Sequence, residues 1–257
     1  MNFRKLLFVA IVLICNTALA QQTTSTKKAT TAKVNQHLKV FNQTMGCGDF
    51  STAISALNYY IAEEGSTNPY VDTLAILYLQ QGAYPQCYYW VEQRLATNPE
   101  DNTLLEMKAV CLDKSGETKE AISIFEKLFK KTQNVFHAYK LLDLQYSIKR
   151  LSEAVATAEA AEKLQYKPEY TMTYTVGQQM GRTYLQSAVL NIHGLALYDL
   201  GKKDEAKKCF EQALALDTTF ALAKQNLEAI RSIENATNSK VIPGVQAPNA
   251  PAAIKQN

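Results

Sequence analysis

The feature that most constrains the fold is a glycine that recurs at a fixed interval. Gly48, Gly82 and Gly116 are spaced 34 residues apart, and Gly201 follows 85 residues after Gly116, which is two intervals and a half. Each glycine ends one stretch of periodically spaced apolar residues and precedes another. A glycine just past a helix end can adopt the left-handed conformation that satisfies the last carbonyl groups. The interval therefore predicts repeated units of two helices.

The residues around these glycines favour the same interpretation. The fifth position after each glycine holds a small residue, which lets two helices approach closely: Ala53, Cys87, Ala121 and Ala206. Apolar residues recur at steps of three and four, as in Ile54, Leu57 and Ile61, and such steps place them on one helix face. We find no stretch with the strict alternation of a β-strand. An all-α fold is therefore expected.

The interval and the small residues resemble the tetratricopeptide repeat, whose unit is a helix-turn-helix of 34 residues. Residues 187–220 match best, through Gly194, Gly201, Ala206, Phe210 and Ala213, and they depart from the family at Leu190, His193 and Thr218. Four further repeats are assigned to residues 34–67, 68–101, 102–135 and 136–168. In the last of these, Arg150 lies near the usual glycine and the turn is one residue shorter. The resemblance implies an α-solenoid of about five repeats, and residues 221–235 are expected to form a capping helix.

The first 20 residues are typical of a secretory signal peptide. Arg4 and Lys5 form a cationic start, residues 6–15 form an apolar run, and residues 18–20 read Ala-Leu-Ala. Cleavage before Gln21 would export the protein to the periplasm or the medium. A membrane anchor is the alternative, but the apolar run is half the roughly 20 residues that a spanning helix needs. Lipidation of Cys15 is disfavoured because bulky Ile14 precedes it.

Three other segments fall outside the repeats. Residues 21–33 form a polar leader and residues 236–257 a tail rich in Asn, Pro and Ala, and both are expected to be flexible. Residues 169–186 are an insertion of half a repeat, for which we expect an extra helix or an extended first helix with a loop. It could contact a partner or serve as a connector. No integral membrane span is expected after signal cleavage.

Composition and motifs exclude several classes of function. The net charge of +3 falls to +1 without Arg4 and Lys5, so the chain has no overall field that would attract nucleic acid. The three histidines fall in different repeats without metal-ligand spacing: His37, His137 and His193. No catalytic or phosphate-binding motif is present, so neither enzymatic activity nor a cofactor is expected.

Four cysteines remain after the signal segment: Cys47, Cys87, Cys111 and Cys209. They lack the CxxC spacing of a zinc or redox site. Their even number in an exported chain allows three complete disulfide pairings, whereas small buried side chains are the other interpretation.

The resemblance implies a partner bound along the concave surface, which the first helix of each repeat lines. Alignment places these residues there: Asn42, Asp72, Ile76, Leu79, Glu106, Val110, Asp113, Lys140, Leu144, Asn191, Leu195 and Tyr198. Members of the family that grip a C-terminal carboxylate need several cationic donors together. Asp72, Glu106 and Asp113 oppose such a ligand. The expected partner is therefore a neutral or basic protein segment with apolar anchors.

Aromatic residues are concentrated in the first two repeats: Tyr59, Tyr60, Tyr78, Tyr84, Tyr88, Tyr89 and Trp90. Most should fill space between helices. Successive helix residues are about 100° apart, so neighbours cannot all face one core. One or two of these rings should therefore reach the surface.

The function expected from the sequence is a non-catalytic adaptor or scaffold of the cell envelope that holds a partner segment in the concave groove. Two alternatives stay open. One is a structural envelope component that assembles with itself through its end faces, and the other is an unrecognised hydrolase.

Overall fold

The computed structural model describes residues 35–238. The expected signal peptide, the leader and all but the first three residues of the expected tail lie outside the described residues. The described part contains eleven helices and one pair of strands: α2 Gln36–Cys47, α3 Phe50–Glu64, α4 Tyr70–Gln80, α5 Tyr84–Leu95, α6 Asn102–Lys114, α7 Thr118–Thr132, α8 Val135–Ser147, α9 Leu151–Glu162, β1 Thr171–Val176, β2 Gln179–Tyr184, α10 Leu185–Asp199, α11 Lys203–Leu216 and α12 Ala221–Asn238.

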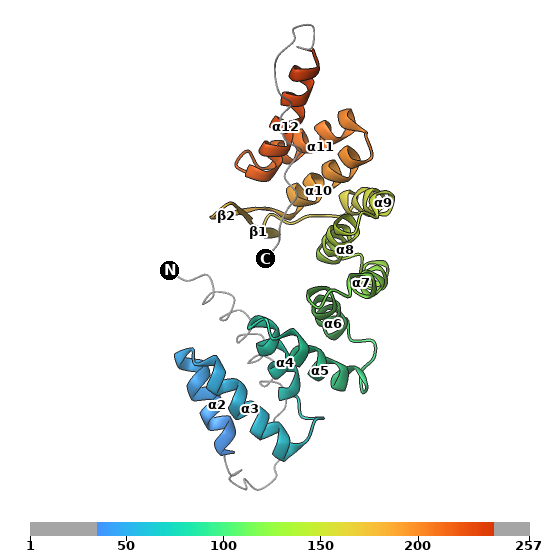
Figure 1. Ribbon diagram of the computed structural model, residues 1–257. Helices are drawn as coiled ribbons and strands as arrows, with labels where there is room; N and C mark the ends of the chain where they lie inside the picture. The colour runs from blue at the N-terminus through green and yellow to red at the C-terminus, as the bar shows by residue number, and fades with distance from the viewer. Residues whose placement is uncertain (1–34, 239–257) are drawn as a thin grey trace.

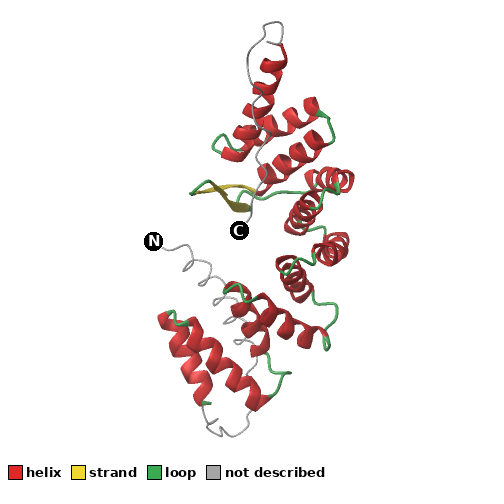
Figure 2. Ribbon diagram, in the orientation of Figure 1, coloured by secondary structure: helices red, strands yellow, loops and turns green. Residues whose placement is uncertain are grey.

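The helices form consecutive pairs, from α2 with α3 to α10 with α11, and each packs mainly against its neighbours in sequence. The pairs follow one another along an open arc (Figures 1 and 2). The first helices α4, α6, α8 and α10 lie on the inner side of the arc, and the second helices α5, α7, α9 and α11 lie on the outer side. The expected α-solenoid is confirmed. Its repeats bury their apolar faces against adjacent repeats.

The turns explain the glycine interval. Gly48, Gly82, Gly116 and Gly201 all have φ between 72° and 89°, in the left-handed region. The fourth turn reaches the same conformation without glycine, because Lys149 has φ of 62°. Arg150 instead begins the next helix as its N-cap residue. Lys149, next to Arg150, therefore takes the place of the family glycine in a turn that is one residue shorter, as expected.

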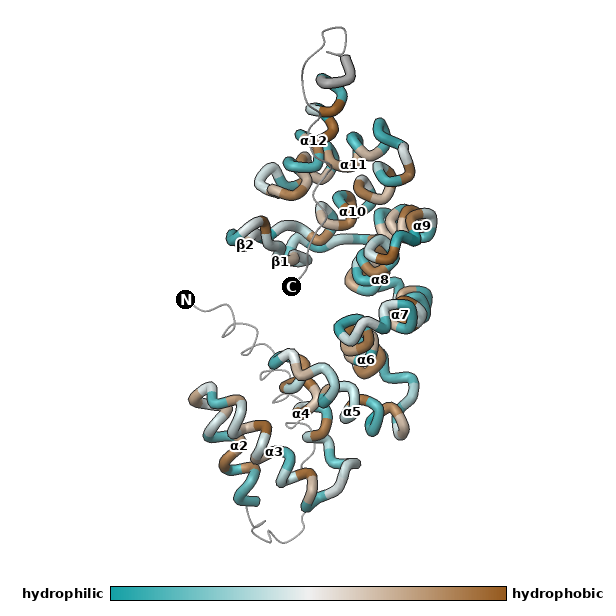
Figure 3. The backbone as a smooth tube through the Cα atoms, viewed as in Figure 1, coloured by the Kyte–Doolittle hydropathy of each residue, from teal (hydrophilic) through white to brown (hydrophobic). Residues whose placement is uncertain are grey.

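Small residues allow the helices within each repeat to pack closely. Ala53, Cys87, Ala121 and Ala206 are all fully buried. Gly194 faces the Phe210 ring, and a Cβ atom at Gly194 would lie 2.6 Å from that ring. Apolar stretches alternate with polar ones along the helices (Figure 3), as expected when one face of each helix is buried.

The insertion forms a β-hairpin, so the expected helix was wrong, as was the view that no strand pattern exists. Strand β1 alternates threonine with Met172, Tyr174 and Val176, and it pairs antiparallel with β2. Val176 pairs with Gln179, which leaves a two-residue loop whose first residue, Gly177, has φ of 59°. Glycine at this position suits a tight hairpin turn.

The hairpin is attached to the C-terminal end of the solenoid through Tyr174. The Tyr174 ring covers its register partner Gly181 and packs on Phe220 at a centroid distance of 4.9 Å. Its hydroxyl accepts a hydrogen bond from the Ala221 backbone N–H at 3.0 Å and donates to the Thr219 carbonyl at 3.4 Å. The hairpin thus joins the corner between α11 and α12, and it projects from the inner side of the arc (Figure 1).

Helix α12 packs on α11 and α10 and reaches Asn238, three residues beyond the expected end of the capping helix. None of the helices between residues 35 and 238 has the length and apolar content that crossing a bilayer requires.

Candidate partner-binding surface

The structure leaves nine of the twelve expected groove residues at least partly exposed and buries three. Asn42 is exposed, and the partly exposed residues are Asp72, Ile76, Leu79, Glu106, Val110, Asp113, Lys140 and Tyr198. The side chains of Leu144, Asn191 and Leu195 are 5%, 0% and 2% exposed. The expectation that these three line an open groove was therefore wrong.

The capping helix explains why Asn191 and Leu195 are buried. The Asn226 side-chain amide on α12 donates a hydrogen bond of 3.0 Å to the Asn191 side-chain oxygen on α10. Leu195 belongs to the same apolar cluster as Leu227 and Ile230 of α12. The alignment placed both residues on a concave surface, but α12 covers that part of α10.

A shift of one residue in the fourth repeat explains Leu144. The N-cap Asn134 comes 33 positions after the N-cap Asp101, and left-handed Lys149 comes 33 positions after Gly116. With this spacing, Val110 and Asp113 of α6 correspond to Asp143 and Tyr146 of α8. These two half-buried residues are the ones the sequence alignment missed. Asn134, a strong N-cap residue immediately before an apolar run, was the signal that could have corrected the register.

Carboxylates from α6 and α8 gather on the inner side of the third and fourth repeats. Burial raises the pKa of Asp143 to about 6, against the opposing effect of Lys140, and the nearby Asp113 carboxylate adds to the rise. The Glu106 carboxylate lies 3.5 Å from Nε2 of the buried His137 side chain. Helices α6 and α8 thus carry three acidic residues, Glu106, Asp113 and Asp143, and Lys114 and Lys140 lie near the last two.

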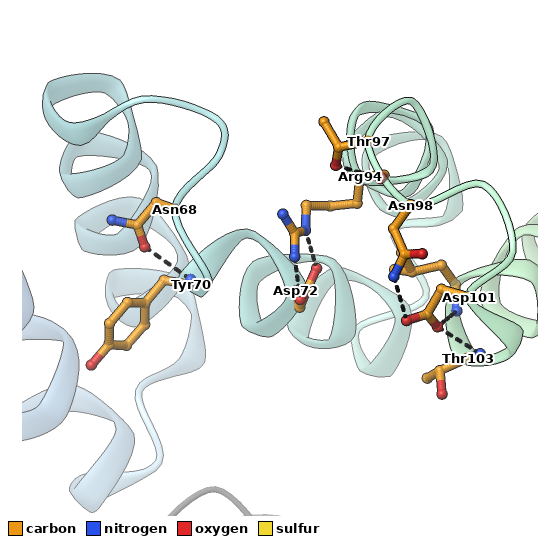
Figure 4. Close-up of polar contacts among 9 residues, drawn as sticks. Asn68, Tyr70, Asp72, Arg94, Thr97, Asn98, Asp101 and Thr103 are labelled. Atoms are coloured by element: carbon orange, nitrogen blue, oxygen red, sulfur yellow. Dashed lines mark hydrogen bonds and ion pairs between the residues drawn. The ribbon is translucent and has the colours of Figure 1, made fainter. Parts of the chain in front are cut away.

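The acidic residue of the second repeat is already paired. Arg94 of α5 contacts Asp72 of α4 through Nε–Oδ1 at 2.6 Å and Nη2–Oδ2 at 3.0 Å, in a two-point geometry (Figure 4). This hydrogen-bonded pairing raises the pKa of Arg94. In the same region the Asp101 carboxylate accepts hydrogen bonds from the Thr103 and Leu104 backbone N–H groups and begins α6. The carboxylates of α6 also have neighbours within the chain, because Asp113 lies 3.7 Å from Lys114 and Glu106 lies beside His137.

A histidine, a cysteine and a glutamate meet between α9, α10 and α11, but not in the geometry of a catalytic triad. Glu162 Oε1 lies 2.6 Å and Cys209 Sγ 3.7 Å from the same atom, His193 Nδ1. In a triad the nucleophile contacts one ring nitrogen and the carboxylate the other. Here His193 Nε2 is buried without a hydrogen-bond partner, and Cys209 is only 7% exposed. The group is arranged as a buried ionic contact between helices.

This contact should make stability depend on pH. Burial disfavours the charged imidazole, but the interactions with Cys209 and Glu162 outweigh it and raise the pKa of His193 from 6.5 to about 9. A raised histidine pKa stabilises the folded state below pH 6.5, and this contribution is lost as pH rises through 9.

We therefore expect His193→Gln to remove stability on the order of 2 kcal/mol at pH 6 and much less at pH 9.5. Urea unfolding at the two pH values measures the difference. The comparison is His37→Gln, because His37 also lies beside a glutamate, 3.2 Å from Glu63, but its side chain is 35% exposed. An equal loss at both pH values would contradict the assignment.

The described cysteines are free thiols. Cys87, Cys111 and Cys209 are buried, and Cys47 is exposed. Cys87 of α5 and Cys111 of α6 lie in one apolar cluster, where a hydrogen bond between the thiols, together with burial, raises the pKa of Cys87. Within the described residues, no group of three or more His, Cys, Asp or Glu side chains is placed to hold a metal ion.

The comparisons with known proteins agree with this architecture. The tetratricopeptide repeat family model matches residues 190–220. The crystal structure of the MamA protein superposes with a TM-score of 0.58 at 17% identity, over 72% of this chain and 92% of MamA. YrrB, described as a TPR protein with an unusual peptide-binding site, superposes with a TM-score of 0.56 at 12% identity, over 73% of this chain and 88% of YrrB. PilF of Pseudomonas aeruginosa superposes with a TM-score of 0.53 at 21% identity, over 65% of this chain and 68% of PilF. No curated protein matches the sequence.

The stacked helix pairs and their exposed inner surface define a helical-repeat protein of the α-solenoid class. The comparisons indicate which kind of helical repeat the chain contains. Residues 190–220 thus match the tetratricopeptide repeat model, and the chain shares the helical-repeat fold of MamA, YrrB and PilF.

Proposed function

We propose that this protein is a non-catalytic adaptor of the cell envelope that binds a basic or neutral protein segment along the inner side of its arc. The observation that carries the proposal is the set of carboxylates on α6 and α8, Glu106, Asp113 and Asp143, of which Asp143 keeps a raised pKa despite the nearby Lys140 and Lys114. A carboxylate held at a pKa of about 6 by burial is stabilised in its ionised form when a cation binds beside it.

Apolar side chains supply the anchors. Ile76 and Leu79 of α4 and Val110 of α6 are partly exposed, and both helices lie on the inner side of the arc (Figure 1). A segment that alternates apolar and basic side chains could use both kinds of contact. The peptide-binding site of YrrB, a protein of the same fold, supports a peptide ligand.

The envelope location rests on the cationic and apolar start of the sequence. Fractionation of cells after expression tests it, together with N-terminal sequencing of the product. Protein recovered in the envelope fraction and beginning at Gln21 is expected. Recovery from the cytoplasm with residues 1–20 intact would refute this part of the proposal.

An array of extended peptides with lysine and leucine at varied positions tests the groove. We expect peptides with both residue types to bind best, and the triple change Glu106→Gln, Asp113→Asn and Asp143→Asn to weaken them tenfold or more, by about 1.4 kcal/mol at least. The control removes three exposed carboxylates from the second helices, Glu120, Glu126 and Glu159, so the net charge is the same. Equal weakening in the control would show that only net charge matters.

Binding should also depend on pH through Asp143. Its carboxyl group is largely protonated below pH 6 and ionised above it. Affinity for a lysine-containing peptide should therefore increase several-fold between pH 5 and pH 7.5, with proton release near pH 6. Asp143→Asn should remove most of this pH dependence. Titration calorimetry in two buffers of different ionisation enthalpy measures both quantities, and an unchanged pH profile in the variant would exclude Asp143 from the binding surface.

A further inference from the structure

The outer side of the arc carries a second candidate site, separate from the inner surface. A hollow of about 560 Å³ lies between α3 and α5, the second helices of the first two repeats. Tyr59, Tyr89 and Trp90 line it together with the polar residues Asn58, Ser66 and Gln93. None of its lining residues is a Lys, Arg, His, Asp or Glu. It is therefore a neutral site with aromatic walls.

Its rings are unusually open to solvent. The side chains of Tyr59 and Tyr89 are 64% and 56% exposed, which confirms that some neighbouring aromatics reach the surface. Tyr59 stacks on His37 at 5.4 Å, and Tyr89 meets Trp90 edge-on at 5.0 Å. Contacts with neighbouring rings restrict both exposed tyrosine side chains. These side chains therefore lose little conformational entropy when a ligand binds.

The hollow suits an extended proline-containing segment. Such segments dock between aromatic side chains because their conformation is already restricted, and their carbonyl groups accept hydrogen bonds from amide and indole N–H groups. The Gln93 amide and the Trp90 indole are the donors in the lining, because both N–H groups of Asn58 are already used, toward the Ile54 carbonyl and the Tyr78 hydroxyl at 2.9 Å. Two exposed glutamates precede Gly65 of the lining: Glu63 contacts Asn35 and His37, and Glu64 favours a ligand with flanking positive charge.

The sequence contains a segment with this chemistry. Residues 239–257, which follow α12, carry Pro243, Pro248 and Pro251, two lysines and no acidic side chain. Helix α12 lies at the opposite end of the arc from α3 (Figure 1), so a second copy is the simpler recipient. We propose that residues 239–257 of one copy bind the hollow between α3 and α5 of another copy.

This contact would join two different surfaces, so it is heterologous. Contacts of this kind form rings when the rotation closes and open chains when it does not. The proposal gives a specific basis for self-assembly, and it does not depend on which partner occupies the inner surface.

Trp90 provides a direct measurement, because it is the single tryptophan of the sequence and lies in the hollow. The protein from Gln21 onward is held at a concentration at which the protein is monomeric. A synthetic peptide of residues 239–257 is then titrated into it. We expect a saturable change in tryptophan fluorescence. A peptide with Pro243, Pro248 and Pro251 replaced by alanine should bind roughly tenfold more weakly. Absence of any change with the native peptide would overturn the proposal.

Two variants separate the hollow from other aromatic surfaces. Tyr89→Ala should weaken the peptide roughly tenfold. Tyr184→Ala, which changes a tyrosine that is 44% exposed on the hairpin, should leave peptide affinity unchanged. Circular dichroism checks that both variants are folded. Equal binding by both variants, or a fluorescence response to chitotetraose but not to the peptide, would overturn the proposal, and the latter would identify a glycan site.

The consequence for assembly is measured by light scattering across a concentration series. The chain from Gln21 onward should gain mass with concentration, and excess free peptide should reverse the gain. Removal of residues 239–257 should abolish it. The triple change at Glu106, Asp113 and Asp143 should have no effect on this assembly, which distinguishes it from binding on the inner surface. Concentration-dependent mass in the truncated chain would contradict the proposal.

Discussion

Gly194→Val is expected to lower the free energy of unfolding of the C-terminal repeats by about 3 kcal/mol, because it overfills a closely packed helix crossing. The first added carbon would lie 2.6 Å from the Phe210 ring, which is fully buried and cannot move away. The two helices would have to separate, which would also loosen α12. Urea unfolding followed by circular dichroism measures the loss, and hydrogen exchange locates it in α10 and α11.

A second pair of changes tests the cause. Gly194→Ala combined with Phe210→Leu should be less destabilised than the sum of the two single changes, because the smaller side chain makes room for the new methyl group. The control is Gly46→Ala in α2, where an added Cβ meets nothing within 4 Å. That change should be neutral or stabilise by up to about 1 kcal/mol. Additive losses at positions 194 and 210 would argue against direct steric conflict.

Tyr174→Ala is expected to release the hairpin and to destabilise the C-terminal end by about 3 kcal/mol. The change removes a buried ring that packs on Phe220, and it leaves the Ala221 N–H without the hydroxyl that accepts its hydrogen bond. Amide exchange should accelerate in β1, β2 and the first turn of α12, while α4 and α5 keep their protection.

Two milder variants complete this test. Tyr174→Phe keeps the ring and should lose only about 1 kcal/mol, the contribution of the hydroxyl hydrogen bonds. Tyr184→Ala changes an exposed tyrosine of the same hairpin and should stay within about 0.5 kcal/mol of the unmodified protein. If Tyr174→Ala lost no more stability than Tyr184→Ala, the contacts of the hairpin would not stabilise the corner between α11 and α12.

The helix pairs could be predicted because glycine has a specific physical role in their turns. Gly48, Gly82, Gly116 and Gly201 mark positions where the backbone needs a positive φ, and small residues mark the helix crossings that follow. The fourth turn breaks this rule, since Lys149 adopts the left-handed conformation at some energetic cost. Without a glycine to fix the register, the alignment was displaced by one residue, so Asp143 and Tyr146 were missed.

The hairpin was missed for a different reason. Its alternation of threonine with Met172, Tyr174 and Val176 spans only six residues, and a search for helical periodicity passes over so short a pattern. The burial of Asn191 and Leu195 could not be predicted from local sequence either. It depends on the position at which α12 folds back on α10, and tertiary packing determines that position.

Packing is unequal along the arc. Helix α10 contacts α8, α9, α11, α12 and both strands, whereas α2 packs chiefly against α3. Heating or mechanical pulling should therefore unravel the protein from its α2 end, with the last repeat separating late. The aromatic hollow belongs to the half that unfolds first. Binding of residues 239–257 from a neighbouring copy would therefore stabilise the least stable part of the protein.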